Sequence, residues 1–185
     1  TSLIPTVKVA EAVRWTDGGK PTAAQGLTVK AFATGLDHPR WIQVLPNGDV
    51  LVAETNAPPK PDDGGGIKGY IQTEVMKKAG AVTPTANRIT LLRDKDGDGV
   101  AETRSEFLTG LNSPVGMALA GGRLYIANTD AVVSVPYSDG ATKISVATEK
   151  LTDLPAGTLN HHWTKGLIAS KDGAKLYATV GSNSN

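Results

Sequence analysis

Short apolar segments separated by turn residues recur along the chain in a fixed order. Each copy opens on a small or polar loop, continues as an apolar strand, turns, and returns as a second strand. Alternating apolar positions bounded by Gly, Asn and Asp turns are typical of antiparallel hairpins. The three copies lie at residues 35–55, 110–129 and 163–180. The chain is therefore an internal repeat of one β unit.

Further strands are expected between these copies. The pattern pairs residues 88–92 with 102–108, and residues 131–135 with 143–148. Each repeat then becomes a four-stranded antiparallel meander, which is the pattern of a β-propeller blade. An ordinary β-sandwich with similar hairpins is the alternative fold.

The number of strands predicts an incomplete propeller. We expect about two and a half blades, ending near residue 180, and one alternating strand at 27–32 that belongs to no blade. Open sheet edges are avoided in natural proteins. We therefore expect residues 1–185 to be the N-terminal part of a single propeller domain, truncated or nicked after residue 185. Residues 56–86, rich in Pro and Gly, are expected to form an inserted loop with a short helix at 71–79.

Composition narrows the choice of partners. The chain has 185 residues, a net charge of +1 and no cysteine. So small a charge predicts no polyanion-binding field, and we expect no nucleic-acid partner. No apolar run approaches the ~20 residues that span a bilayer. The absence of cysteine excludes a disulfide scaffold and thiolate metal sites, and it fits either an oxidising or a reducing compartment.

An acidic turn at residues 94–102 is a candidate metal site. Its carboxylates stand at alternate positions and a glycine occupies the sixth, a spacing that can wrap oxygen ligands around Ca²⁺. Ser105 in place of a twelfth-position Glu, and strands in place of helices, depart from an EF-hand. The same residues also favour a solvated Asp-Gly turn with no ion. The candidate ligands of a structural, peripheral Ca²⁺ are Asp94, Asp96, Asp98, Val100 and Glu102.

A pair of histidines is the candidate catalytic feature. His161 and His162 stand directly before the inner strand of the third repeat, where a propeller loop opens onto the central channel. A neutral imidazole there can accept a proton. The alternative is that both histidines are structural, and the residue pattern leaves the two interpretations open. In the equivalent loops of the first two repeats stand His38, Arg40 and Asn112.

The order of several motifs resembles the glucose/sorbosone dehydrogenase family. The motifs lie at residues 35–42, 66–70, 86–93, 96–99, 114–118, 125–130 and 162–165. Members of that family are six-bladed propellers that use pyrroloquinoline quinone (PQQ) and Ca²⁺. The resemblance extends over nearly all of residues 35–185, and it implies a complete protein about twice as long.

The resemblance implies a quinoprotein sugar dehydrogenase. His162 would be the general base in oxidation of an aldose or sorbosone-like aldehyde or hemiacetal, with hydride transfer to the quinone. His161, Arg40 and Asn112 would contact the cofactor. The resemblance further implies an electron acceptor, a periplasmic or secreted location, and catalytic Ca²⁺ ligands beyond residue 185, so this part alone would be inactive. Many relatives carry Arg and Asn where this chain has Lys165 and Gly166.

Two other functions remain open on the sequence. One is a non-catalytic propeller that binds a partner, with structural histidines. The other is a Ca²⁺-dependent propeller lactonase or hydrolase.

Overall fold

The computed structural model describes residues 16, 18–58, 67–78, 84–157, 160 and 162–181. The chain divides into two compact units, one of residues 1–29 and 61–84 and the other of residues 30–60 and 85–185. The helix α1 (Ile67–Lys78) belongs to the first unit, and all the strands described below belong to the second.

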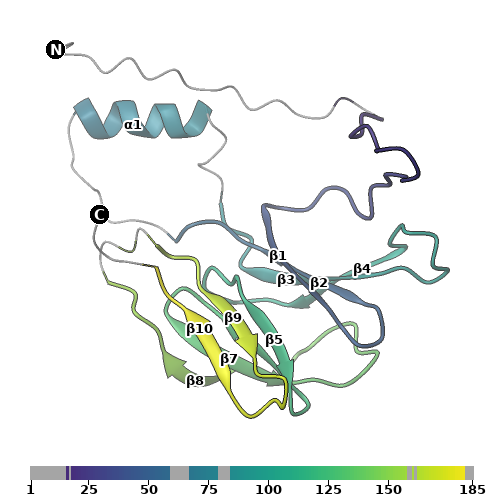
Figure 1. Cartoon of the computed structure of the whole chain (residues 1–185). Coiled ribbons are helices and arrows are strands. Elements are labelled where there is room, and N and C mark those ends of the chain that lie inside the picture. The colour runs from purple at the N-terminus through teal and green to yellow at the C-terminus, as the bar shows by residue number, and fades with distance from the viewer. Residues whose placement is uncertain are drawn as a thin grey trace. The chain divides into compact units, whose positions relative to one another are not determined.

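The second unit contains three antiparallel sheets (Figure 1). The first has the order β1-β2-β3-β4 and consists of β1 (Pro39–Val44), β2 (Val50–Glu54), β3 (Arg88–Arg93) and β4 (Thr103–Leu108). The second has the order β5-β6-β7-β8 and consists of β5 (Met117–Ala120), β6 (Arg123–Ala127), β7 (Ala131–Pro136) and β8 (Glu149–Asp153). The third pairs β9 (Gly166–Ala169) with β10 (Leu176–Thr179).

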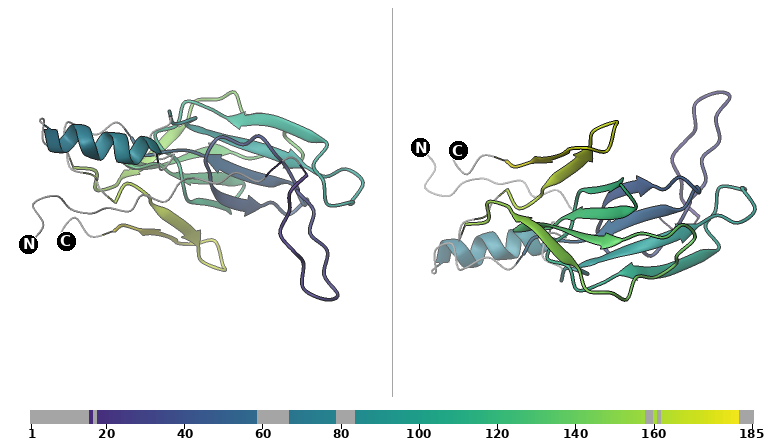
Figure 2. Two further views of the ribbon diagram at one scale, coloured as in Figure 1. Left: turned by 90° about the horizontal axis from the view of Figure 1, so that it is seen from above. Right: turned by 90° about the horizontal axis from the view of Figure 1, so that it is seen from below.

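This arrangement is that of a partial β-propeller. The first strand of the second sheet, β5, contacts the first strands of the other two sheets, β1 and β9. The first strand of each repeat is therefore the inner one. The two complete meanders and the β9–β10 hairpin, which stands on one flank of them in Figure 2, confirm the all-β propeller with about two and a half blades.

The core lies where the faces of the first two sheets meet. Side chains on alternate positions of the strands point into it, as the period-2 pattern requires. Each fully buried Leu, Ile or Phe contributes about 1.5–3 kcal/mol through removal of apolar area from water. The fully buried residues of this core include Leu51, Ile89, Leu91, Phe107, Leu124 and Ile126.

Two predicted strands are wrong. Residues 27–32 form no strand; the Phe32 carbonyl accepts one backbone hydrogen bond, from Ala101, and no ladder forms. Residues 143–148 are also irregular, and the fourth strand of the second sheet is β8 instead. The reason is that Ile144 donates its backbone N–H to Phe107 and packs against the common core, so this apolar segment joins the two sheets.

The inserted segment between β2 and β3 contains the expected helix. α1 begins at Ile67, four residues before the predicted start, and residue 79 lies outside the described part of the chain. Among the described residues, none belongs to a helix with the length and apolar character needed to span a membrane.

Candidate functional site at the entry to the inner strands

The loops that enter the inner strands meet at one end of the second unit. The Arg40 guanidinium lies over the Trp163 ring, 5.5 Å from its centroid. The Gly116 N–H donates to the Lys165 carbonyl at 2.9 Å. The entry to β9 therefore contacts both other inner strands, in the arrangement that the repeats indicate. Arg40 and Asn112 are exposed there.

His162 lies in the turn before β9, with its side chain exposed. Its carbonyl oxygen accepts a hydrogen bond of 2.8 Å from the Lys165 ammonium. Lys165 itself is buried, and this desolvation lowers the pKa of its amine. Sequence reasoning noted Lys165 only as a departure from relatives and missed its burial. His161, the other predicted histidine, lies outside the described residues.

The same strained turn positions the entry loops of the first two repeats. His38 and Ser113 both precede a proline and both have a left-handed backbone, with φ of 49° and 46°. Such a conformation costs about 1–3 kcal/mol for a residue other than glycine, and it persists only when neighbours hold it. Here Thr55 donates its N–H to the His38 carbonyl, and the Asn87 side chain accepts the Ser113 N–H.

A buried carboxylate ties the first entry loop to its sheet. Glu54, at the end of β2, is 0% exposed and receives two hydrogen bonds of 3.1 Å from Arg88. The Thr90 hydroxyl and the Asp37 amide also donate to it. Burial opposes ionisation of Glu54, but the hydrogen bonds from Arg88, Thr90 and Asp37 outweigh it and lower the pKa of the carboxyl.

This network predicts that acid destabilises the fold. A carboxyl whose pKa is lower in the folded than in the unfolded protein contributes stability above the unfolded pKa, and that contribution is lost as pH falls through the folded value. We expect the unfolding temperature to fall as pH drops below about 4.5, the ordinary pKa of Glu. In Glu54→Gln the fall measured by calorimetry between pH 6 and pH 3 should be shallower. An unchanged slope would contradict the assignment.

The acidic turn connects β3 and β4, as predicted for an outer hairpin. Carboxylate oxygens of Asp94, Asp96, Asp98 and Glu102, one from each residue, all lie within 4.8 Å of one another. The amides of Gly99 and Gly97 donate to Asp94, and these hydrogen bonds lower the pKa of its carboxyl despite some desolvation. The ligand role of these residues and of Val100 stays a prediction.

Strand register places this turn far from the entry loops. Glu54 pairs with Pro39 at the start of β1 and with Arg88 at the start of β3. Val50 pairs with Leu92, near the end of β3. The turn after β3 therefore lies at the opposite end of the sheet. A cation bound there would be structural.

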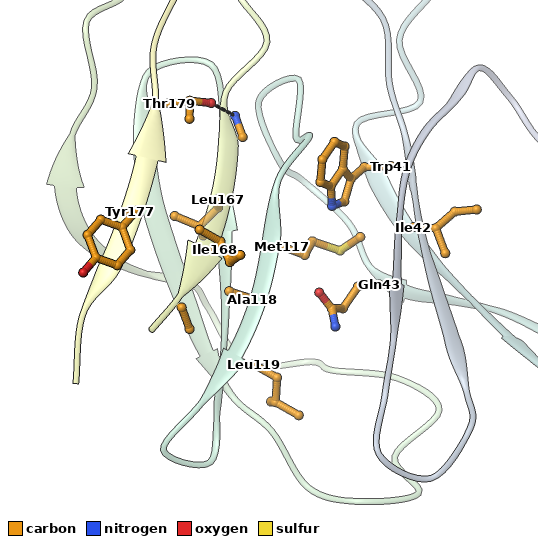
Figure 3. Close-up of a pocket in the computed structure, with 12 residues that line it drawn as sticks. Trp41, Ile42, Gln43, Met117, Ala118, Leu119, Leu167, Ile168, Tyr177 and Thr179 are labelled. Atoms are coloured by element: carbon orange, nitrogen blue, oxygen red, sulfur yellow. Dashed lines mark hydrogen bonds between the residues drawn. The ribbon is translucent and has the colours of Figure 1, made fainter. Parts of the chain in front are cut away.

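An open groove of about 510 Å³ runs along the inner strands (Figure 3). Trp41, Gln43 and Met117 border it on the β1–β5 side, and Leu167, Ile168 and Tyr177 border it on the β9–β10 side. Ile168 is 64% exposed. Sequence reasoning concentrated on the loops and missed this groove; the apolar inner-strand positions were the available signal.

The repeated meander around a common set of inner strands defines this protein as part of a β-propeller. It is similar to the holo form of the PQQ domain of pyranose dehydrogenase from Coprinopsis cinerea, with a TM-score of 0.56, 17% identity, and coverage of 81% of this chain and 29% of that one. It is also similar to a Trichoderma reesei protein of carbohydrate-active enzymes family AA12, with a TM-score of 0.61, 19% identity, and coverage of 89% and 35%. At these identities the likeness shows the fold.

Residues 22–185 match the family described as domain of unknown function DUF7133, and the chain belongs to that family. No curated protein matches the sequence. The chain spans about a third of the length of the solved structures that it resembles.

Proposed function

We propose that this chain is part of a PQQ-dependent dehydrogenase that oxidises an aldose or a sorbosone-like sugar aldehyde or hemiacetal. The observation that carries the proposal is the exposed His162, which directly precedes Trp163 and its contact with Arg40, in a fold shared with a PQQ domain. A periplasmic or secreted location and an external electron acceptor belong to the same proposal.

The residues at the entry loops fit such a cofactor. PQQ is a planar quinone with three carboxylates, and when bound it supplies a hydride acceptor. The Arg40 guanidinium lies over the Trp163 ring and is exposed, and its N–H donors suit a carboxylate. The exposed Asn112 amide can donate a further hydrogen bond. We assign Arg40 and Asn112 to the cofactor, and a cofactor contact by His161, which lies outside the described residues, stays a prediction.

The chain's part in the chemistry is proton transfer. The imidazole of His162 would accept the hydroxyl proton of the substrate, and PQQ, if bound, would supply the acceptor for the hydride of the adjoining C–H bond. An external acceptor would take up the two electrons of the oxidation. We propose that further blades complete the channel and supply the remaining contacts to cofactor and sugar.

The test is reconstitution of the natural polypeptide that carries this sequence. With PQQ and Ca²⁺ added, we expect quinone binding, seen as quenching of tryptophan fluorescence, and dye reduction with aldoses or sorbosone. The same protein without PQQ is the control. Absence of both quinone binding and sugar oxidation would contradict the proposal and favour a non-catalytic binding propeller.

We propose separately that the turn at 94–102 binds a structural Ca²⁺. Sites of modest affinity have dissociation constants of about 1 mM, so 5 mM Ca²⁺ should raise the free energy of unfolding by about 1 kcal/mol. Urea unfolding measures this gain, which should vanish in Asp96→Asn and persist in Asp130→Asn, where the replaced carboxylate lies elsewhere. An equal gain in all three proteins would show that Ca²⁺ acts at another place.

A further inference from the structure

Lys165 is a buried cation in the loop that carries His162. Lys165 as a whole is only 1% exposed. Burial of an ammonium group is costly unless polar partners replace water. Within the described part of the chain no carboxylate forms an ion pair with Lys165. The partner that the structure does provide is the His162 carbonyl oxygen, 2.8 Å from Nζ. One hydrogen bond does not replace the water that the buried ammonium has lost, so the stability of the fold alone does not favour a lysine here.

The backbone of Lys165 is anchored to the neighbouring blade. Its carbonyl accepts the Gly116 N–H at 2.9 Å. The two backbones pack so closely that a Cβ at Gly116 would lie 2.7 Å from the Gly166 carbonyl carbon. A lysine whose backbone is fixed at this end can hold the His162 peptide at the other, through the hydrogen bond from its amine to the His162 carbonyl oxygen.

The other side of His162 is bounded by Gly181. A Cβ at Gly181 would lie 2.7 Å from the His162 Cβ and 3.1 Å from Nδ1. The His162 side chain therefore packs on bare backbone where the chain leaves β10, while its carbonyl is held by Lys165. These two contacts restrict the peptide plane and the side chain of an otherwise exposed residue.

We propose that Lys165 is a positioning residue that, together with the close packing of Gly181, sets the direction of the His162 imidazole. This inference rests on the proposed role of His162 as the base. A base must be held within about 0.5 Å of its productive position by contacts that lock its conformation. Lys165 supplies such a contact from within the protein and does not touch the substrate.

The kinetic test uses Lys165→Met, which keeps the length of the side chain and removes its donor. We expect kcat to fall about tenfold, a part of the 10²–10⁴-fold that a general base contributes, with KM within about twofold. Lys165→Arg restores a donor and should recover most of kcat. Lys171→Met, at an exposed lysine of the β9–β10 turn, is the charge-matched control and should match the wild type. A kcat unchanged in Lys165→Met would overturn the proposal.

A second readout does not need activity. The chain has three histidines, so ¹³C labelling of histidine gives few signals, and the His162 signal is identified by its loss in His162→Gln. We expect this signal to shift and broaden in Lys165→Met and to recover in Lys165→Arg. If Lys165→Met fails to fold, Gly181→Ala displaces the same imidazole without changing charge.

The two readouts separate the proposals. A wild type without PQQ-dependent oxidation refutes the proposed function, and the His162 signal still decides whether Lys165 holds the imidazole. A His162 signal unchanged in Lys165→Met, or in Gly181→Ala when that is the variant that folds, would overturn the positioning role whatever the activity.

Discussion

His162→Gln is expected to lower kcat of PQQ-dependent sugar oxidation by about 10²–10⁴-fold, the range that a positioned general base contributes. Glutamine is close in size to histidine but does not accept a proton near neutral pH. His162 is exposed and its hydrogen bond to Lys165 uses only the backbone carbonyl, so the fold should survive the change. Steady-state kinetics with saturating PQQ measures the loss, and circular dichroism checks the fold.

Adding imidazole to His162→Ala is a second test of His162 as the general base. A free base of the right chemistry should restore part of kcat in a saturable manner, because the cavity left by the side chain opens at the exposed end of the loop. Retention of wild-type kcat in His162→Gln, with PQQ bound, would exclude His162 as the base and return it to a structural role.

Gly116→Ala is expected to reduce the free energy of unfolding by about 3 kcal/mol, at the upper end of the usual cost of overpacking. The added methyl would lie 2.7 Å from the Gly166 carbonyl carbon and 2.8 Å from the Leu167 Cβ, and the nearest atoms belong to backbone, which cannot rotate away. β9 would have to move from β5, and the hydrogen bond from Gly116 to Lys165 would lengthen.

Urea unfolding measures the effect as a lower midpoint with an unchanged slope. Gly157→Ala is the matched control, because a Cβ at Gly157 meets no atom within 4 Å and its backbone is not left-handed. If the two alanine variants unfold at the same urea concentration, then β5 and β9 do not approach as closely as described.

Much of the fold could be predicted from the repeat because its information is local. The turn after β1, with Asn47 and Gly48, and the turn before β10, with Asp172 and Gly173, each specify a hairpin whose strands alternate in the expected way. The prediction failed at residues 143–148, where Ile144 packs between sheets. A period-2 pattern reports that a side chain is buried but not which neighbour buries it.

Of the candidate site, too, only a part could be predicted from the sequence. The entry loops, with Arg40, Asn112 and His162, could be located from the repeat, because equivalent positions in successive blades meet at one end of the inner strands. The acidic turn was also correctly placed on the outer hairpin. The burial of Glu54 and Lys165 could not be predicted, since in sequence both are ordinary charged residues.

By itself the sequence determined the repeated β meander, the propeller class and the loops that enter the inner strands, since strand period and turn residues act between neighbours in the chain. Only the tertiary structure decided which charges are buried and which side chains meet. Arg88 reaches Glu54 across 34 positions of the sequence, and Arg40 reaches Trp163 from another blade. Such contacts depend on how whole sheets pack against one another. The distances and directions between sheets cannot be predicted from a local sequence pattern.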